Sequence, residues 1–152
     1  MTLGLGKFTT LAVATVSVLL LSLSGTAMAT ASESKEIQTA IEHAGFASKS
    51  KSASQIHLHL HHVINCLVGP EGAGYDPAAG DPCESEGGGA LDDLKGSPKE
   101  YLQQAVDLAK TGVNIDHRTP AHNVAIAVDA LLKEAQGAMQ SGTEPKGHRK
   151  KS

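Results

Sequence analysis

The chain has 152 residues, with 13 basic and 16 acidic side chains and a net charge of −3 when histidine is neutral. This mild acidity argues against nucleic acid as a partner, which requires a basic face. The sequence has no Trp and only two Phe and two Tyr, so its core must be mainly aliphatic, and its length suits one small domain.

The first 29 residues have the pattern of a secretory signal peptide. Lys7 precedes an apolar run from Leu11 to Leu23, and Ala27 and Ala29 form a small-x-small cleavage pattern. The run is too short for a convincing membrane span. We therefore predict cleavage after Ala29, and a periplasmic or secreted product without stable membrane insertion.

Four later stretches carry the 3.6-residue apolar period of amphipathic helices. They run from about Glu33 to Phe46, from about Ala53 to Leu67, onward from near Pro98, and through the apolar positions between Ala121 and Ala135. For the last of these, Thr119 is the predicted N-cap, Pro120 suits the first helical position and Gly142 can end the helix.

A long connection from Gly69 to Ser97 separates the second and third helices. It contains eight glycines and three prolines, which argue against a regular element. Cys66 and Cys83 are the only cysteines, and in an exported protein a pair is normally a disulfide rather than a set of metal-binding thiolates. Such a bridge would pin the first half of the loop and stabilise the fold by roughly 3 kcal/mol.

Residues 40–67 and 105–132 align without a gap at a constant offset of 65. Either a duplicated helical hairpin or helical periodicity alone could produce the match. Both explanations predict an all-α fold over residues 30–142, an antiparallel four-helix bundle of two hairpins joined by the Gly-rich, disulfide-pinned loop. Residues 143–152 are predicted to be a basic, disordered tail.

The stretch "HLHLHHVINC" places four histidines within six residues. On a helix, His57 and His61 lie on one flank of the apolar stripe, whereas His59, His62 and Cys66 lie on the other. Pairs at i, i+4 and i, i+3 can each share an ion, so the helix offers two half-sites. The predicted metal ligands are His57, His61, His59, His62 and His122, with His122 as the natural third ligand for the first pair and His43 and His117 as further candidates.

Imidazole-rich sites without methionine suit Cu(II), Ni(II) or Zn(II), and copper should bind most tightly in vitro. A short exported chain with "AIEHA", "HLHLHH" and "PAHNVAIAVDALLKEA" resembles the small histidine-rich periplasmic metal-binding proteins. The resemblance implies a four-helix bundle that buffers or scavenges copper and similar ions. Those proteins spread histidines over all helices, whereas here they concentrate in one, which favours one or two sites over high-capacity storage.

The sequence therefore predicts an exported protein that binds copper, zinc or nickel for buffering, delivery or sensing. Two alternatives remain open at this point: a haem-binding bundle, or a periplasmic interaction module that acts through its Gly-rich loop. No nucleophile–base pattern is present, so we do not expect an enzyme. The pattern identifies no protein partner.

Overall fold

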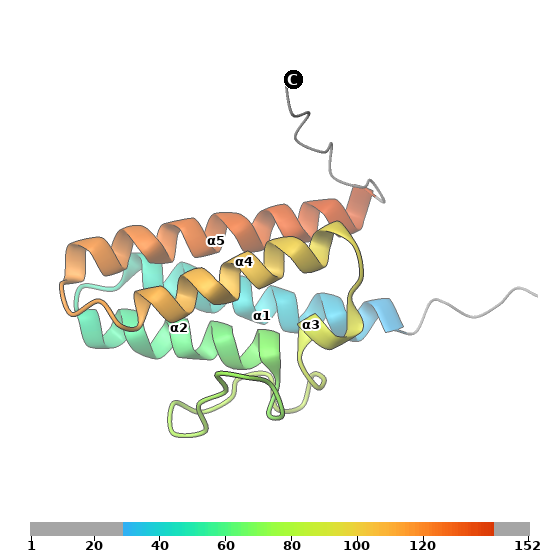
Figure 1. Cartoon of the computed structure of the whole chain (residues 1–152), viewed down its shortest axis with the longest axis horizontal. Coiled ribbons are helices and arrows are strands. Elements are labelled where there is room, and N and C mark those ends of the chain that lie inside the picture. Colours follow the sequence, from blue (N-terminus) through green and yellow to red (C-terminus); the bar gives the residue numbers. More distant parts are fainter. Residues whose placement is uncertain (1–28, 142–152) are drawn as a thin grey trace, which may run out of the picture.

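The computed structural model describes residues 29–141 (Figure 1). Within them the chain forms helices and no strands, which confirms the all-α prediction. The helices are α1 (Ala29–Lys49), α2 (Ala53–Val68), α3 (Ala90–Asp93), α4 (Ser97–Gly112) and α5 (Arg118–Ser141). Apart from Ala29, the predicted signal peptide lies outside the described residues, as does the predicted basic tail.

The helix boundaries follow local capping chemistry. At the start of α2, the Ser52 side chain accepts a hydrogen bond from the Gln55 N–H at 3.3 Å. Helix α5 begins one residue before the predicted N-cap Thr119, because the Ala121 N–H already donates to the His117 carbonyl at 3.2 Å. Pro120 still lies in the first turn, where its missing N–H costs no helical hydrogen bond.

The four long helices lie side by side (Figure 1). α1 packs against α2 and α5, α4 packs against the same two helices, and α2 also contacts α5. The apolar core positions of α2 and their counterparts in α5 are fully buried, as the apolar period predicts. They are Ile56, Leu60, Val63 and Leu67 in α2 and Ala121, Ala125, Val128 and Leu132 in α5.

The Gly-rich connection is fixed at two points. Cys66 and Cys83 form the predicted disulfide, and both are buried. Gly69 and Gly89 have φ of 68° and 117°, and a Cβ on Gly89 would lie 2.6 Å from the Gly69 nitrogen. Only glycine allows the backbone at these two positions to approach so closely. The sequence did not predict α3, a single helical turn near the end of this connection.

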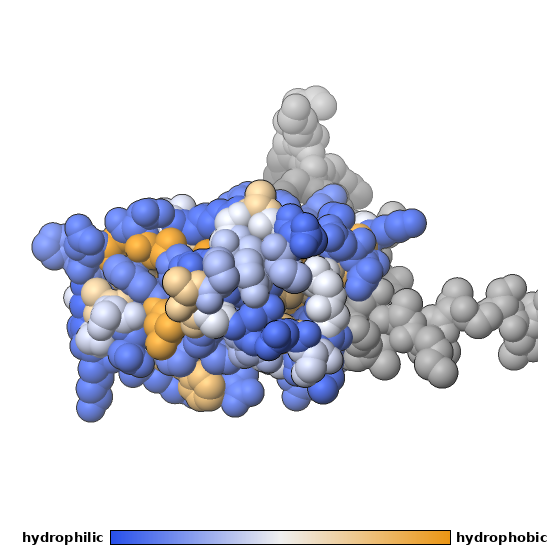
Figure 2. All heavy atoms as spheres, turned by 90° about the horizontal axis from the view of Figure 1, so that it is seen from below, coloured by the Kyte–Doolittle hydropathy of each residue, from blue (hydrophilic) through white to orange (hydrophobic). Residues whose placement is uncertain are grey.

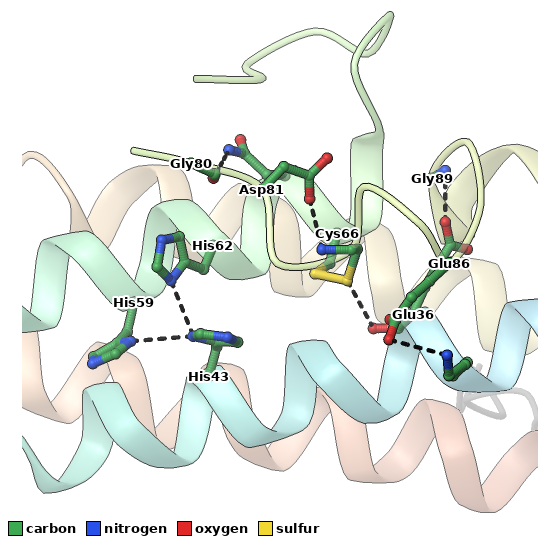
Figure 3. The surroundings of a disulfide bond; sticks show 12 residues. Glu36, His43, His59, His62, Cys66, Gly80, Asp81, Glu86 and Gly89 are labelled. Carbon is green, nitrogen blue, oxygen red and sulfur yellow. Dashed lines mark hydrogen bonds and ion pairs between the residues drawn. A yellow bond between two sulfur atoms is a disulfide. The ribbon is translucent and has the colours of Figure 1, made fainter. Parts of the chain in front are cut away.

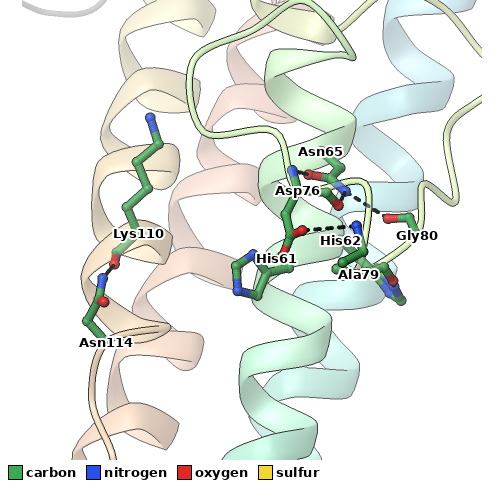
Figure 4. Close-up of polar contacts among 9 residues, drawn as sticks. His61, His62, Asn65, Asp76, Ala79, Gly80, Lys110 and Asn114 are labelled. Carbon is green, nitrogen blue, oxygen red and sulfur yellow. Dashed lines mark hydrogen bonds and ion pairs between the residues drawn. The ribbon is translucent and has the colours of Figure 1, made fainter.

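One buried amide holds the middle of the loop on α2. Asn65 is fully buried, and its Nδ2 donates to the carbonyls of Asp76 and Gly80 at 2.8 and 2.7 Å (Figure 4). Its Oδ1 accepts from the Asp76 N–H at 2.9 Å. These three bonds use most of the hydrogen-bonding capacity of the amide, so the burial of this polar side chain is compensated.

The surface that Figure 2 shows is mainly hydrophilic, with small apolar spots between charged and polar side chains. Among the described residues, none of the helices combines the length and the apolar character needed to cross a bilayer.

Candidate metal centre

Three imidazoles from two packed helices meet at the surface of the α1–α2 pair. His43 comes from α1, and His59 and His62 come from adjacent turns of α2 (Figure 3). The Nδ1 atom of His43 lies 3.2 Å from Nδ1 of His59 and 3.0 Å from Nδ1 of His62. All three residues are partly buried, and they form a group of potential ligands whose donor atoms lie within 4.8 Å of one another.

The protonation of His62 follows from its second ring nitrogen. Its Nε2 lies 2.7 Å from the carbonyl oxygen of Ala79, which can only accept a hydrogen bond. Nε2 therefore carries the hydrogen, and in the neutral ring Nδ1 presents its lone pair to the cluster. Metal-bound histidines almost always donate their other N–H to a carboxylate, a backbone carbonyl or water in this way.

The cluster cannot satisfy all its nitrogens by itself. If Nδ1 of His43 carries a proton, that proton can be donated to only one of the two neighbouring nitrogens. If Nδ1 of His43 is unprotonated, its lone pair faces the lone pair of His62 Nδ1. One of the two Nδ1 contacts therefore lacks a hydrogen bond in either tautomer. A tetrahedral zinc shell with bonds of about 2.0 Å separates ligand nitrogens by about 3.3 Å. The observed 3.0 and 3.2 Å are close to that separation.

The surroundings of the cluster favour the neutral form of two of its rings. Burial lowers the pKa of His43 from 6.5 to about 4, and neighbouring His62 and His59 add to the effect. Burial also lowers the pKa of His59, again with a contribution from His62. Because a metal binds the neutral imidazole, these shifts reduce the competition from protons in mildly acidic solution.

An aromatic ring lies beside the cluster. The ring centroid of Phe46 is 5.6 Å from that of His43 and 5.3 Å from that of His59. Phe46 is nevertheless 41% exposed, unusually high for a large apolar side chain in this protein. The histidine cluster is therefore bordered by an apolar ring at the surface, and it is not sealed inside the core.

The other predicted ligands have different contacts. His57 Nε2 donates to the Ile115 carbonyl at 2.9 Å and so ties the start of α2 to the connection between α4 and α5. His61 Nδ1 lies 3.4 Å from Asp76 Oδ2, and His122 Nδ1 is buried without a hydrogen-bond partner. Within the described part of the chain, His57, His61 and His122 do not bring their donor atoms together as a group of three. Their role as ligands stays a prediction.

The structure thus joins one predicted half-site, His59 and His62, to a histidine that the sequence offered only as a further candidate. A usable signal was present in α1. His43 lies three residues after Ala40 and directly precedes Ala44, both fully buried, so it borders the apolar stripe that packs on α2. Which flank of α2 this border meets depends on how the two helices are rotated against each other, and periodicity does not give that rotation.

Cys66, Cys83 and Asp81 form a second group of potential ligands. The two sulfur atoms are joined as a disulfide, so they are not available as thiolates. Asp81 Oδ1 accepts from the Cys83 N–H at 2.9 Å and shapes the turn before the bridge. This group is therefore structural in the oxidised protein.

The chain matches no protein-family profile, no curated protein and no solved structure.

Proposed function

We propose that this chain is an exported protein that binds one transition-metal ion through Nδ1 of His43, His59 and His62. The observation that carries the proposal is the convergence of these atoms, with the single N–H of the neutral His62 ring donated to the Ala79 carbonyl. The scaffold we propose is an antiparallel four-helix bundle in which α1 and α2 supply the ligands. The buried disulfide is compatible with export, since such bridges persist in oxidising compartments.

The number and exposure of the ligands favour an exchangeable ion. Structural zinc sites are closed by four protein ligands, whereas three ligands leave a position for water or a ligand from another molecule. The cluster is partly buried and bordered by the exposed Phe46 ring, which leaves it near the surface. Buffering or delivery of the ion therefore suits this site better than a purely structural role, in line with the resemblance to small histidine-rich periplasmic proteins.

The donor set also limits the choice of ion. Three imidazoles suit Cu(II), Ni(II) and Zn(II), and the Irving–Williams order places copper first. We therefore expect Cu(II) to bind most tightly in vitro and Zn(II) to bind measurably.

The test is a titration of untagged, metal-stripped protein with Zn(II) or Cu(II) against a competing chelator. We expect one tightly bound ion per chain, and a loss of affinity exceeding about 100-fold in His43→Ala, because removing a ligand should cost more than removing an outer partner. His122→Ala is the matched control, since it removes a partly buried histidine from outside the cluster. Full affinity in His43→Ala, or loss of affinity in a His57→Ala/His61→Ala variant, would contradict the proposal.

A further inference from the structure

The face of α2 that carries the metal ligand His62 also carries two attachments of the Gly-rich loop. His62, Asn65 and Cys66 are spaced i, i+3 and i+4, so they lie on one side of the helix. Each contacts the loop segment 76–83: His62 through the Ala79 carbonyl, Asn65 through its amide and Cys66 through the disulfide. Figure 3 shows Gly80 and Asp81 of this segment on the same side of α2 as the histidine cluster, and Figure 4 shows Ala79 and Gly80 beside His62 and Asn65.

We propose that the loop segment 76–83 is the outer coordination shell of the metal site, and that the Cys66–Cys83 disulfide makes metal affinity dependent on redox state. This inference rests on the proposed function and adds its regulation. The segment supplies the acceptor that fixes the hydrogen of His62 on Nε2. Loss of such outer partners typically costs about 10–100-fold in metal affinity.

The disulfide has this influence because it is the covalent attachment of segment 76–83 to α2, beside the side-chain hydrogen bonds of His62 and Asn65. The described residues from 69 to 89 form turns and bends without a helix or strand, and five of the glycines within them stand at exposed or partly exposed positions. Ordering such a backbone costs about 1–2 kcal/mol per residue in conformational entropy. A bridge across this 17-residue separation offsets about 3 kcal/mol of that cost by restricting the open chain.

Reduction would remove this restriction. A dithiol reductant transfers two electrons and two protons to the bridge, the S–S bond breaks, Cys66 and Cys83 become thiols, and the reductant is oxidised to its own disulfide. The segment is then held on α2 by side-chain contacts alone. The Ala79 carbonyl can move away from His62 Nε2, and the hydrogen can move to Nδ1, where it blocks coordination. The histidine site therefore holds the ion more tightly when the bridge is closed than when it is open.

The test uses a Cys66→Ala/Cys83→Ala variant, which opens the bridge without creating thiolates that could bind metal themselves. Zinc affinity is measured by chelator competition, and the protonation of His62 in the metal-free protein is read from its imidazole ¹⁵N shifts. We expect an affinity loss of about 10–100-fold and a His62 ring that no longer carries its hydrogen on Nε2 alone. Glu84→Gln, an exposed change in the same loop, is the matched control and should leave both readouts unchanged.

A second variant covers the case in which the double variant fails to fold, as judged by its helical circular dichroism. Asn65→Asp keeps the disulfide but removes the two N–H groups that hold the Asp76 and Gly80 carbonyls, and should produce the same two changes. Wild-type zinc affinity in the folded variants, with His62 still protonated on Nε2, would overturn this inference alone. Failure of the wild-type protein to bind zinc or copper would overturn the proposed function, and this inference with it.

Discussion

His43 on α1 and His62 on α2 approach one another with their Nδ1 atoms 3.0 Å apart, while the other ring nitrogen of His62 is hydrogen-bonded to the Ala79 carbonyl. When the His62 ring is neutral, its unprotonated Nδ1 therefore faces His43. His59 extends the contact to a third Nδ1 atom. The proposed metal site depends on this arrangement.

Bound metal should stabilise the folded protein, since the unfolded chain does not hold the three imidazoles together. With free zinc at about 100 times the dissociation constant, the free energy of unfolding should rise by about 2.7 kcal/mol. Urea denaturation with and without zinc measures this rise. His59→Ala should lose most of it and His122→Ala should keep it; equal stabilisation of both variants would place the ion elsewhere.

His43 should titrate far below an ordinary histidine in the metal-free protein. Burial and the neighbouring rings lower its pKa from 6.5 to about 4. Between these values the unfolded chain binds a proton that the folded protein does not, so the free energy of unfolding should decrease as the pH falls from 6.5 towards 4. The pH dependence of the His43 ring signals in NMR measures the midpoint, and a midpoint near 6.5 would show that the ring is not desolvated.

Glu36, which contacts the loop at Gly89, should give the opposite dependence of stability on pH. Glu36 is 1% exposed, and its burial raises its pKa above 4.5. The Gly89 N–H donates to the Glu36 carboxylate at 2.9 Å and opposes this shift. The negative charges of Asp93, Glu86 and Asp81 raise the pKa further. The folded protein then keeps a proton that the unfolded chain has lost. Stability from this group is therefore present below pH 4.5 and is lost as the pH rises through the pKa of the folded state.

A Glu36→Gln variant tests this directly, because its amide cannot ionise. The stability of the variant relative to wild type, from urea denaturation, should improve as the pH rises above 4.5. A difference that stays constant with pH would mean that Glu36 is ionised at no cost in the folded protein.

Two helical glycines should respond to alanine with opposite signs. A Cβ on Gly112 at the end of α4 would lie 2.6 Å from Leu60 Cδ1 and 2.8 Å from Val124 Cγ1. Gly112→Ala should therefore destabilise the protein by about 1–3 kcal/mol. Gly137 in α5 has no such neighbour within 4 Å, so Gly137→Ala should stabilise by about 0.5–1 kcal/mol. Thermal denaturation compares the wild type with the two variants. An unchanged melting temperature in Gly112→Ala would show that the end of α4 is loosely packed against its neighbours.

The helical class of the fold was predictable because helical periodicity reports which positions are buried. Ile56, Leu60, Val63 and Leu67 follow that period and are fully buried, and the cysteine pair forms the expected disulfide. The site was only half predictable. The spacing of His59 and His62 is a property of one helix, whereas the third imidazole of the cluster, His43, is placed by the packing of α1 against α2.

The loop contains the other contacts of the candidate site that the sequence did not predict. The contact between Ala79 and His62 joins a backbone carbonyl to a side chain 17 residues away. Every residue has a backbone carbonyl, so the sequence does not indicate which one accepts this hydrogen bond. Likewise, the engagement of His57 with the Ile115 carbonyl and the position of His61 beside Asp76 follow from tertiary packing. The composition of the segment indicated only that it would be irregular.

Imidazole ¹⁵N NMR of the metal-free protein, before and after one equivalent of Zn(II), tests whether His43, His59 and His62 bind one ion together. We expect their Nδ1 signals to shift together and to saturate at one ion per chain, while the signals of His57, His61 and His122 stay in place. Saturable shifts confined to His57, His61 and His122, or no saturable shift in any histidine, would contradict metal binding by this cluster.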